Sequence, residues 1–425
     1  MTRAAALSAG LSDRIAELAE LYRDLHEHPE LSFQEQRTAA LVAARLTAAG
    51  FEVTAGVGGT GVVGVLRNGA GPSVLLRADM DALPVGEADR VPYRSRATAA
   101  GPDGIVGPVM HACGHDAHVT ALLGAADQLA ARRDHWSGTV LAVFQPAEEI
   151  GAGARAMLDD GFLDRFPRYD VALGQHITSA PSGHLYARPG VFMAAADSLR
   201  VTVFGRGGHG SMPQATVDPI VIAAAIVLRL QTIVSREIAA TDVAVVTVGA
   251  IRGGSKENVI PAEAELKLNI RTFDADVRRR VLAAVERIVK AEAAAAGAPR
   301  EPEIAPINDF PLLVNDEDTT RKVVAAFTES FGEDQVHETG RKPGSEDFGC
   351  FGTAAGVPSV FWNFGGFDPA LYPEGPDLPQ RAVAAGTAPG NHSPEFVPTE
   401  IEQTLQRATE ALLTAAAIWL SPDGG

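Results

Sequence analysis

The segment Met110–His118 concentrates side chains that can bind metal ions. It places His111, Cys113, His115 and His118 within eight residues, in a chain that has eleven histidines and two cysteines. Thiolate and imidazole are ligands of zinc and of similar borderline metals. Cys113 and His115 lie two residues apart on a turn before a predicted helix, so their side chains can converge on one face. The alternative is a small buried cysteine with histidines in capping or core roles.

Glu148 and Glu149 follow directly after a predicted strand and offer a second chemistry. Adjacent carboxylates on an extended chain point in roughly opposite directions. One can then bind a metal ion while the other holds a water molecule as a general base. Alone, such a pair is more often a solvated helix start, so the neighbouring residues decide the interpretation.

Polar residues also follow other strands that we predict in the first half of the chain. Asp79 and Asp81 come just after the second strand, and His176 comes after the fourth. In an open α/β sheet, ligands bind beyond the carboxyl ends of the strands. We therefore expect these residues to meet the Cys113–His115 turn at one edge of the sheet. The four predicted strands cover Val62–Leu66, Val74–Leu76, Thr139–Phe144 and Asp170–Leu173.

Alternating strands and amphipathic helices predict an α/β fold with a mostly parallel sheet flanked by helices. One of these helices is expected to start with Asp116 as its N-cap. Between about residues 192 and 310 the order becomes strand, helix, strand, strand, helix, strand, which is typical of a ferredoxin-like α+β sandwich. We expect one α/β domain of residues 1–191 and 311–425, interrupted by a compact inserted domain of residues 192–310.

Composition narrows the class of protein. The 425 residues are 46% hydrophobic and 21% charged, which is typical of a soluble globular protein and excludes a disordered one. A formal net charge of −17 would repel a phosphate backbone and argues against nucleic-acid binding. The longest clean apolar run, Ile220–Leu228, is nine residues and too short to span a membrane. The two distant cysteines, Cys113 and Cys350, and a stretch Ala4–Leu11 unlike a signal peptide predict a cytoplasmic protein.

A series of motifs runs in order along nearly the whole chain. They are His26–Glu30, Leu76–Asp81, Met110–His118, Phe144–Glu149 with Gly151–Gly153, Gly174–His176, Gly207–Pro213, Asn258–Pro261, Gly344–Phe348 and Gly390–Pro394. Together they resemble the metal-dependent amidohydrolases of the aminoacylase and carboxypeptidase G superfamily. The resemblance is closest to the branch of hippurate hydrolases, N-acyl-amino-acid amidohydrolases and indoleacetyl-amino-acid hydrolases.

The resemblance implies that residues 1–191 and 311–425 form a catalytic metal-binding domain, with a general base at Glu148 and metal ligands at five positions. It implies a lid or dimerisation domain for residues 192–310. Asp81 would orient a ligand or the base without binding metal itself. Most of the wider superfamily has a histidine where Asp79 stands and an aspartate near the Cys113 turn, so this sequence resembles the cysteine-bearing branch. The implied ligands hold one or two divalent ions, Zn²⁺ or Mn²⁺, and are Cys113, His115, Glu149, His176 and His392.

The implied activity is hydrolysis of the amide bond of N-acyl amino acids such as N-acetyl or N-benzoyl compounds, which releases a carboxylic acid and an amino acid. In the family, a histidine of the inserted domain stabilises the oxyanion; it maps to His209, with Asn258 near the substrate. Arg271 ends a predicted strand and either binds a substrate carboxylate or forms a structural salt bridge. The expected partners are this small molecule and a second copy of the chain, in a homodimer or higher homo-oligomer formed through the inserted domain.

Three other interpretations stay open. In one, Cys113 is a nucleophile with His115 as its base, which leaves the glutamates and the other histidines without a role. In another, the chain is a metal-stabilised binding or scaffold protein, against which an intact Glu148 argues. In the third, an enzyme of the same superfamily acts on short peptides as a carboxypeptidase or dipeptidase. His111 and His118 are expected to be structural.

Overall fold

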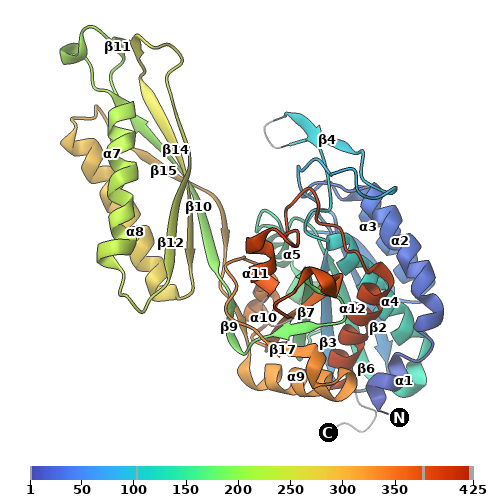
Figure 1. Cartoon of the computed structure of the whole chain (residues 1–425). Helices are drawn as coiled ribbons and strands as arrows, with labels where there is room; N and C mark the ends of the chain where they lie inside the picture. The colour runs from blue at the N-terminus through green and yellow to red at the C-terminus, as the bar shows by residue number, and fades with distance from the viewer. Residues whose placement is uncertain (1, 102–103, 376–378, 421–425) are drawn as a thin grey trace. The chain divides into compact units, whose positions relative to one another are not determined.

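The computed structural model describes residues 2–101, 104–375 and 379–420, which form two compact units (Figure 1). The first unit contains Met1–Phe192, Val314–Gly340 and Asp347–Gly425, and the second contains Met193–Leu313 and Arg341–Glu346. The second unit is therefore inserted in the sequence of the first. It also includes the short segment Arg341–Glu346, which was not predicted from the sequence to belong to it. Two short strands, β9 (Gly190–Met193) and β16 (Leu313–Asn315), mark where the chain passes between the units.

An eight-stranded mixed sheet forms the centre of the first unit, in the order β1-β2-β6-β3-β7-β18-β8-β17. The central strands β6, β3, β7 and β18 run parallel, whereas β1, β2 and β6 pair antiparallel toward one edge. The mostly parallel sheet is thus confirmed for the centre. The strands are β1 (Glu52–Val57), β2 (Gly61–Asn68), β3 (Ser73–Asp79), β6 (Gly138–Gln145), β7 (Val171–Pro181), β8 (Leu185–Ala187), β17 (Val336–Glu338) and β18 (Ser359–Phe367). A separate hairpin pairs β4 (Thr98–Ala100) with β5 (Val106–Pro108).

The central strands are buried on both faces, which is why their sequences are continuous apolar runs. Val74 and Leu76 of β3 belong to a core shared with α4 (His115–Ala131) and α12 (Ile401–Ala417), and the equally buried Leu75 faces the other way. The other helices of this unit are α1 (Arg3–Leu7), α2 (Ile15–Glu27), α3 (Gln36–Ala48), α5 (Gly153–Asp159), α6 (Phe162–Arg165), α9 (Glu317–Phe331), α10 (Gly349–Ala355) and α11 (Pro379–Ala385).

The second unit is a ferredoxin-like sandwich, as the sequence predicts. Its four-stranded antiparallel sheet has the order β12-β14-β10-β15, and helices α7 and α8 pack on it. A two-stranded ribbon of β11 (Gly208–His209) and β13 (Val259–Ile260) joins two of its loops. The main elements are β10 (Ala195–Phe204), α7 (Pro219–Thr232), β12 (Ala244–Gly253), β14 (Glu263–Thr272), α8 (Ala275–Ala295) and β15 (Glu303–Phe310).

One helical stretch of the described residues, Pro219–Glu237, is long and apolar enough to cross a membrane by those two criteria alone. It consists of α7 and a following π-helical turn. Its Ile222, Ile226 and Leu230 side chains are buried in the core of the second unit. Part of its apolar surface is therefore explained by packing inside the sandwich.

The start of α4 differs from the prediction. The helix begins at His115, and the residue before it is Gly114 in the left-handed conformation, so Asp116 is not its N-cap. Asp116 Oδ2 instead lies 2.6 Å from Nδ1 of His26 on α2, and His26 Nε2 lies 3.0 Å from Glu87. The carboxylate is drawn into this buried contact between helices, which a local capping pattern does not reveal.

Candidate active site

Three central strands carry polar side chains at one edge of the sheet. Asp79 is the last residue of β3 and Gln145 the last of β6, and the strand register pairs the two. His176 lies inside β7 rather than after it, because this strand is longer than predicted. Arg77 pairs with Gly174, which puts His176 level with Asp79. The expected gathering of polar groups at the carboxyl edge of the sheet is observed.

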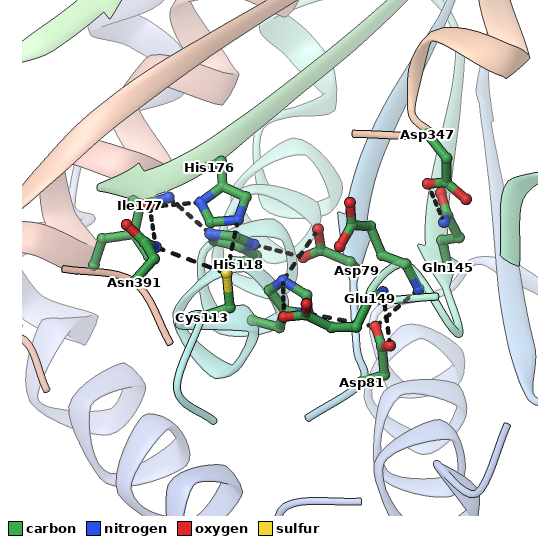
Figure 2. Close-up of polar contacts among 12 residues, drawn as sticks. Asp79, Asp81, Cys113, His118, Gln145, Glu149, His176, Ile177, Asp347 and Asn391 are labelled. Carbon is green, nitrogen blue, oxygen red and sulfur yellow. Dashed lines mark hydrogen bonds and ion pairs between the residues drawn. The ribbon is translucent and has the colours of Figure 1, made fainter. Parts of the chain in front are cut away.

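The turn before α4 brings Cys113 and His115 beside this edge. Gly114 between them has a φ of +77°, and a Cβ there would lie 2.3 Å from Ile177 Cγ2, so the turn requires glycine. Cys113 Sγ lies 3.4 Å from His176 Nε2 (Figure 2). Cys113 and His115 are buried, at 7% and 0% exposure. The turn thus places the Cys113 thiol and the His115 imidazole, both buried, beside the half-buried His176 imidazole of β7.

A second tight turn, directly after β6, carries Glu148 and Glu149. The Asp81 carboxylate accepts the N–H of Glu148 through Oδ1 and the N–H of Glu149 through Oδ2, both at 3.0 Å. Glu149 Oε1 is 3.7 Å from His115 Nε2, and Glu149 Oε2 is 3.4 Å from His392 Nε2. The turn therefore places Glu149 beside His115 and His392. Figure 2 shows Glu149 and the Asp81 carboxylate that binds the backbone of this turn.

The structure brings together all five residues that the family resemblance implies as ligands, and some of their buried atoms lack partners. Among the described residues, both ring nitrogens of His115 and Oε1 of Glu149 have no hydrogen-bond partner. Buried polar groups are nearly always paired, so these atoms fit an additional bound group. Ligands about 2.1–2.3 Å from one ion at tetrahedral angles lie about 3.5 Å apart. Three pairs fit that spacing: Cys113 with His176 at 3.4 Å, His115 with Glu149 at 3.7 Å, and His392 with Glu149 at 3.4 Å.

The electrostatics of the region also fit a cation. Burial, together with the Glu149 and Glu148 carboxylates, raises the pKa of the Cys113 thiol well above its usual value. Burial raises the pKa of Glu149 to about 8, and the Asp81 carboxylate adds to this effect. A bound divalent cation has the opposite effect on these pKa values, because it favours the thiolate and carboxylate forms that bind it. The donor set and its charge therefore suit a divalent metal.

Comparison with known proteins agrees with this chemistry. Residues 75–388 match Peptidase family M20/M25/M40. The chain belongs to this family. Hippurate hydrolase of Campylobacter jejuni is 39% identical over 345 residues, which cover 80% of this chain and 86% of that protein. Thermostable carboxypeptidase 2 of Saccharolobus solfataricus is 39% identical over 339 residues, which cover 79% of this chain and 82% of that one.

A solved M20-family structure shows a similar fold over nearly the whole chain. It is a dinuclear metal binding peptidase from Bacillus subtilis, with a TM-score of 0.73 and 30% identity, covering 96% of this chain and 99% of that one. The predicted membership in a superfamily of metal-dependent amidohydrolases is confirmed. The M20-family chain is thus a metallo-amidohydrolase, and the interpretation as a non-catalytic scaffold is not supported.

In this M20-family chain, Asp79 and His118 form a closed network behind the candidate ligands. His118 Nε2 accepts the N–H of Ile177 at 2.8 Å, so its proton is on Nδ1, which donates to Asp79 Oδ1. The other Asp79 oxygen accepts from Arg77 Nη1 at 2.7 Å. Both residues have their polar atoms engaged, which fits the structural role expected for His118. His111 is also buried, and burial lowers its pKa to about 4.

The remaining predicted residues lie in the second unit. His209 lies on β11 and pairs with Val259 of β13, and Asn258 directly precedes β13. His209 and Asn258 therefore lie close together at the same two-stranded ribbon. His209 Nδ1 accepts from the N–H and the hydroxyl of Ser211, which leaves Nε2 to carry the proton of the neutral ring. Arg271 donates to the Pro343 carbonyl at 2.6 Å. No ion pair of Arg271 is found in the described part of the chain, so the alternative role of Arg271 in a structural salt bridge is not observed there.

Sequence reasoning missed three polar groups around the site. Asn391 donates to the Ile177 carbonyl, and its Nδ2 lies 3.7 Å from Cys113 Sγ. Asp347 accepts from Gln145 Nε2 at 2.6 Å beneath the same sheet edge. Both belong to motifs that carry the family resemblance, which is the signal that could have found them. The third is Glu35, which accepts the N–H of Ala147 directly before Glu148; its position next to α3 in the sequence gives no signal of this contact.

Proposed function

We propose that this M20-family chain hydrolyses the amide bond of N-acyl amino acids, with Glu148 as the general base. The products are a carboxylic acid and a free amino acid. One observation carries the proposal: five candidate metal ligands cluster beside a further carboxylate, Glu148, which is 5% exposed and whose backbone is held by Asp81. The relative named hippurate hydrolase supports the substrate class.

The candidate ligands and the base have separate tasks in this reaction. When bound, divalent ions at this site polarise a carbonyl group and lower the pKa of a water molecule. Glu148 removes a proton from the attacking water and then delivers it to the nitrogen of the leaving amine. We propose two ions, because a similar solved structure is dinuclear. Thiolate and imidazole ligands favour Zn²⁺, and the Glu149 carboxylate also suits Mn²⁺. The proposed ligands are Cys113, His115, Glu149, His176 and His392.

Three residues of the second unit are proposed to bind the substrate. His209 donates from Nε2 to the oxyanion that develops on the carbonyl, since Ser211 occupies its Nδ1 and fixes this tautomer. Asn258, on the same ribbon, contacts the substrate. Arg271 binds the substrate carboxylate, an interaction that suits the planar guanidinium group.

Cleavage of short peptides is the second candidate, favoured by the relative named thermostable carboxypeptidase 2. A panel of N-acetyl, N-benzoyl and N-indoleacetyl amino acids, run beside dipeptides with the same C-terminal residue, separates the two by the release of free amino acid. A dipeptide carries an ammonium group that must lose its water on entering the site, whereas an acyl group does not. We expect a kcat/KM at least about tenfold higher for an N-acyl amino acid. Faster cleavage of the dipeptides would favour the peptidase.

We also propose that the chain forms a homodimer through the second unit. Its edge strand β12 exposes Val245 and Ile251, and α7 exposes Val221 and Leu228, which is 74% exposed. An exposed edge strand beside apolar side chains is suited to pairing with a second copy.

Light scattering after size exclusion tests the dimer. The wild-type chain is expected at twice the mass of one chain, and Leu228→Glu at the mass of one, because a carboxylate would be buried at the interface. The matched control is Leu163→Glu, an exposed position of the first unit, which is expected to leave the mass unchanged. A wild-type monomer would contradict the proposal.

A cytoplasmic location is a further proposal. Neither Cys113 nor Cys350 forms a disulfide, which fits a reducing compartment. Cys350 lies half-buried in the first turn of α10. The proposed role of Cys113 as a metal ligand also requires a thiol that stays reduced.

A further inference from the structure

The turn that carries the proposed base is held by carboxylates at three consecutive backbone N–H groups. Asp81 accepts those of Glu148 and Glu149, each at 3.0 Å. The N–H of Ala147, one residue earlier, is accepted by Glu35 Oε1 at 2.9 Å. Glu35 comes from a distant part of the chain and was not expected to be near the site.

The conformation of Ala147 needs such a contact. Its φ is +50°, and only two other non-glycine residues of the described chain, Phe33 and His392, also have positive φ. L-residues with a side chain disfavour this left-handed region, so surrounding contacts must hold it. Ala147 is fully buried, and its N–H would lack an acceptor without Glu35.

Glu35 does not serve the helix that it precedes. As the N-cap residue of α3 it makes no capping hydrogen bond with its side chain. The first turn of α3 is instead capped by Glu30, whose carboxylate accepts the N–H groups of Arg37 and Thr38 at 2.9 and 2.8 Å. Glu35 is therefore free to turn inward, where it is 0% exposed and its Oε2 accepts the Thr60 hydroxyl at 2.5 Å.

We propose that Glu35 is a positioning residue of the reaction: by holding the N–H of Ala147 it fixes the direction in which Glu148 enters the site. The inference rests on the proposed function, because it assigns the base role to Glu148. Asp81 fixes the two N–H groups that follow, and Glu35 fixes the point where the chain leaves β6. Without Glu35, the strained turn can relax and carry the Glu148 carboxylate away from the water.

The length of the side chain, and not its charge, should matter at this position. Burial and the neighbouring Asp81 carboxylate raise the pKa of Glu35 to about 7, but Oε1 accepts the Ala147 N–H in either protonation state. Glutamine keeps both the reach and the acceptor. Aspartate keeps the charge but is one methylene shorter, so its oxygen is withdrawn from the Ala147 N–H.

The test compares Glu35→Ala, Glu35→Gln and Glu35→Asp with Thr60→Val as a matched control, using metal-loaded protein and both N-benzoylglycine and N-acetylmethionine as probes. Glu35→Ala is expected to lower kcat about 30- to 100-fold, with KM within about threefold and bound metal unchanged, because small misplacements of a catalytic group cost this much. Glu35→Gln should stay within about threefold of the wild-type kcat and Glu35→Asp should lose about tenfold. Thr60→Val removes the other partner of Glu35 and should keep kcat within about threefold.

Wild-type kcat in Glu35→Ala, or a lower kcat in Glu35→Gln than in Glu35→Asp, would overturn the proposal. If Glu35→Ala does not fold, the order of the Gln and Asp variants decides alone. Glu148→Gln is measured in the same assay. Full activity in Glu148→Gln would overturn the proposed function and this inference together, whereas an inactive Glu148→Gln with a fully active Glu35→Ala would overturn the inference only.

Discussion

Replacing Glu148 by glutamine is expected to lower kcat for amide hydrolysis about 1,000-fold, within the range that general acid–base catalysis contributes. Glutamine has nearly the same shape as glutamate, but it cannot take a proton from water. The backbone of residue 148 stays bound to Asp81 in this variant, since that bond uses the N–H group. Bound metal should therefore be unchanged. Steady-state kinetics and metal analysis of the same preparation check both expectations.

The adjacent residue supplies the matched control. Glu149 faces His115 and His392, at 3.7 and 3.4 Å, and is proposed as a ligand. Glu149→Gln should therefore lower both the metal content and the rate, whereas Glu148→Gln should lower the rate alone. If both variants lose metal to the same extent, or if Glu148→Gln keeps its rate, the division of labour between the two carboxylates is wrong.

Cys113→Ala is expected to lower metal affinity at least about 100-fold and to abolish turnover at low metal concentration. The thiol is buried at the turn before α4, within 3.4 Å of His176 Nε2, and its removal leaves one ligand position empty. Cys113→Asp restores an anionic ligand of similar size. We expect this variant to recover metal binding and part of the activity. Metal titrations of the two variants, followed by rate measurements, check this pair.

The same pair separates the metal site from a cysteine nucleophile. A nucleophilic Cys113 would leave both variants inactive whatever their metal content, because a carboxylate at this position cannot replace a thiolate in that role. The geometry also disfavours the alternative in which Cys113 is the nucleophile and His115 its base. The imidazole beside Cys113 Sγ is that of His176, while the two nitrogens of His115 lie near Asp81 and Glu149.

The layers of the fold were predictable because the spacing of apolar residues along the chain indicates which positions are buried. Continuous apolar runs such as Val74–Leu76 became central strands buried on both faces, and the alternating β10 became a strand of the sandwich. The segment Arg341–Glu346 was not predictable, because its membership in the second unit depends on tertiary contacts far along the chain. The capping role expected for Asp116 failed for the same reason, since His26 lies 90 positions away from it.

In the candidate site, too, the local motifs were predictable and the long-range contacts were not. Cys113, His115 and Glu149 stand in compact motifs, where residue type and spacing carry the chemistry. The contacts that hold these residues are not visible in such motifs, because they join distant segments. Asp81 accepts backbone N–H groups 67 and 68 positions away, and Glu35 accepts one 112 positions away. Such interactions depend on backbone N–H groups, which every residue except proline has, so the sequence contains no pattern for them.

The most direct test of metal-assisted amide hydrolysis is a titration of metal-free wild-type chain with Zn²⁺ or Mn²⁺, in which bound metal and the hydrolysis of N-benzoylglycine and N-acetylmethionine are measured on the same samples. We expect no turnover without metal, a rate that rises with occupancy, and a plateau at one or two ions per chain. Hydrolysis at the full rate by metal-free protein, lost on alkylation of its thiols, would contradict this mechanism.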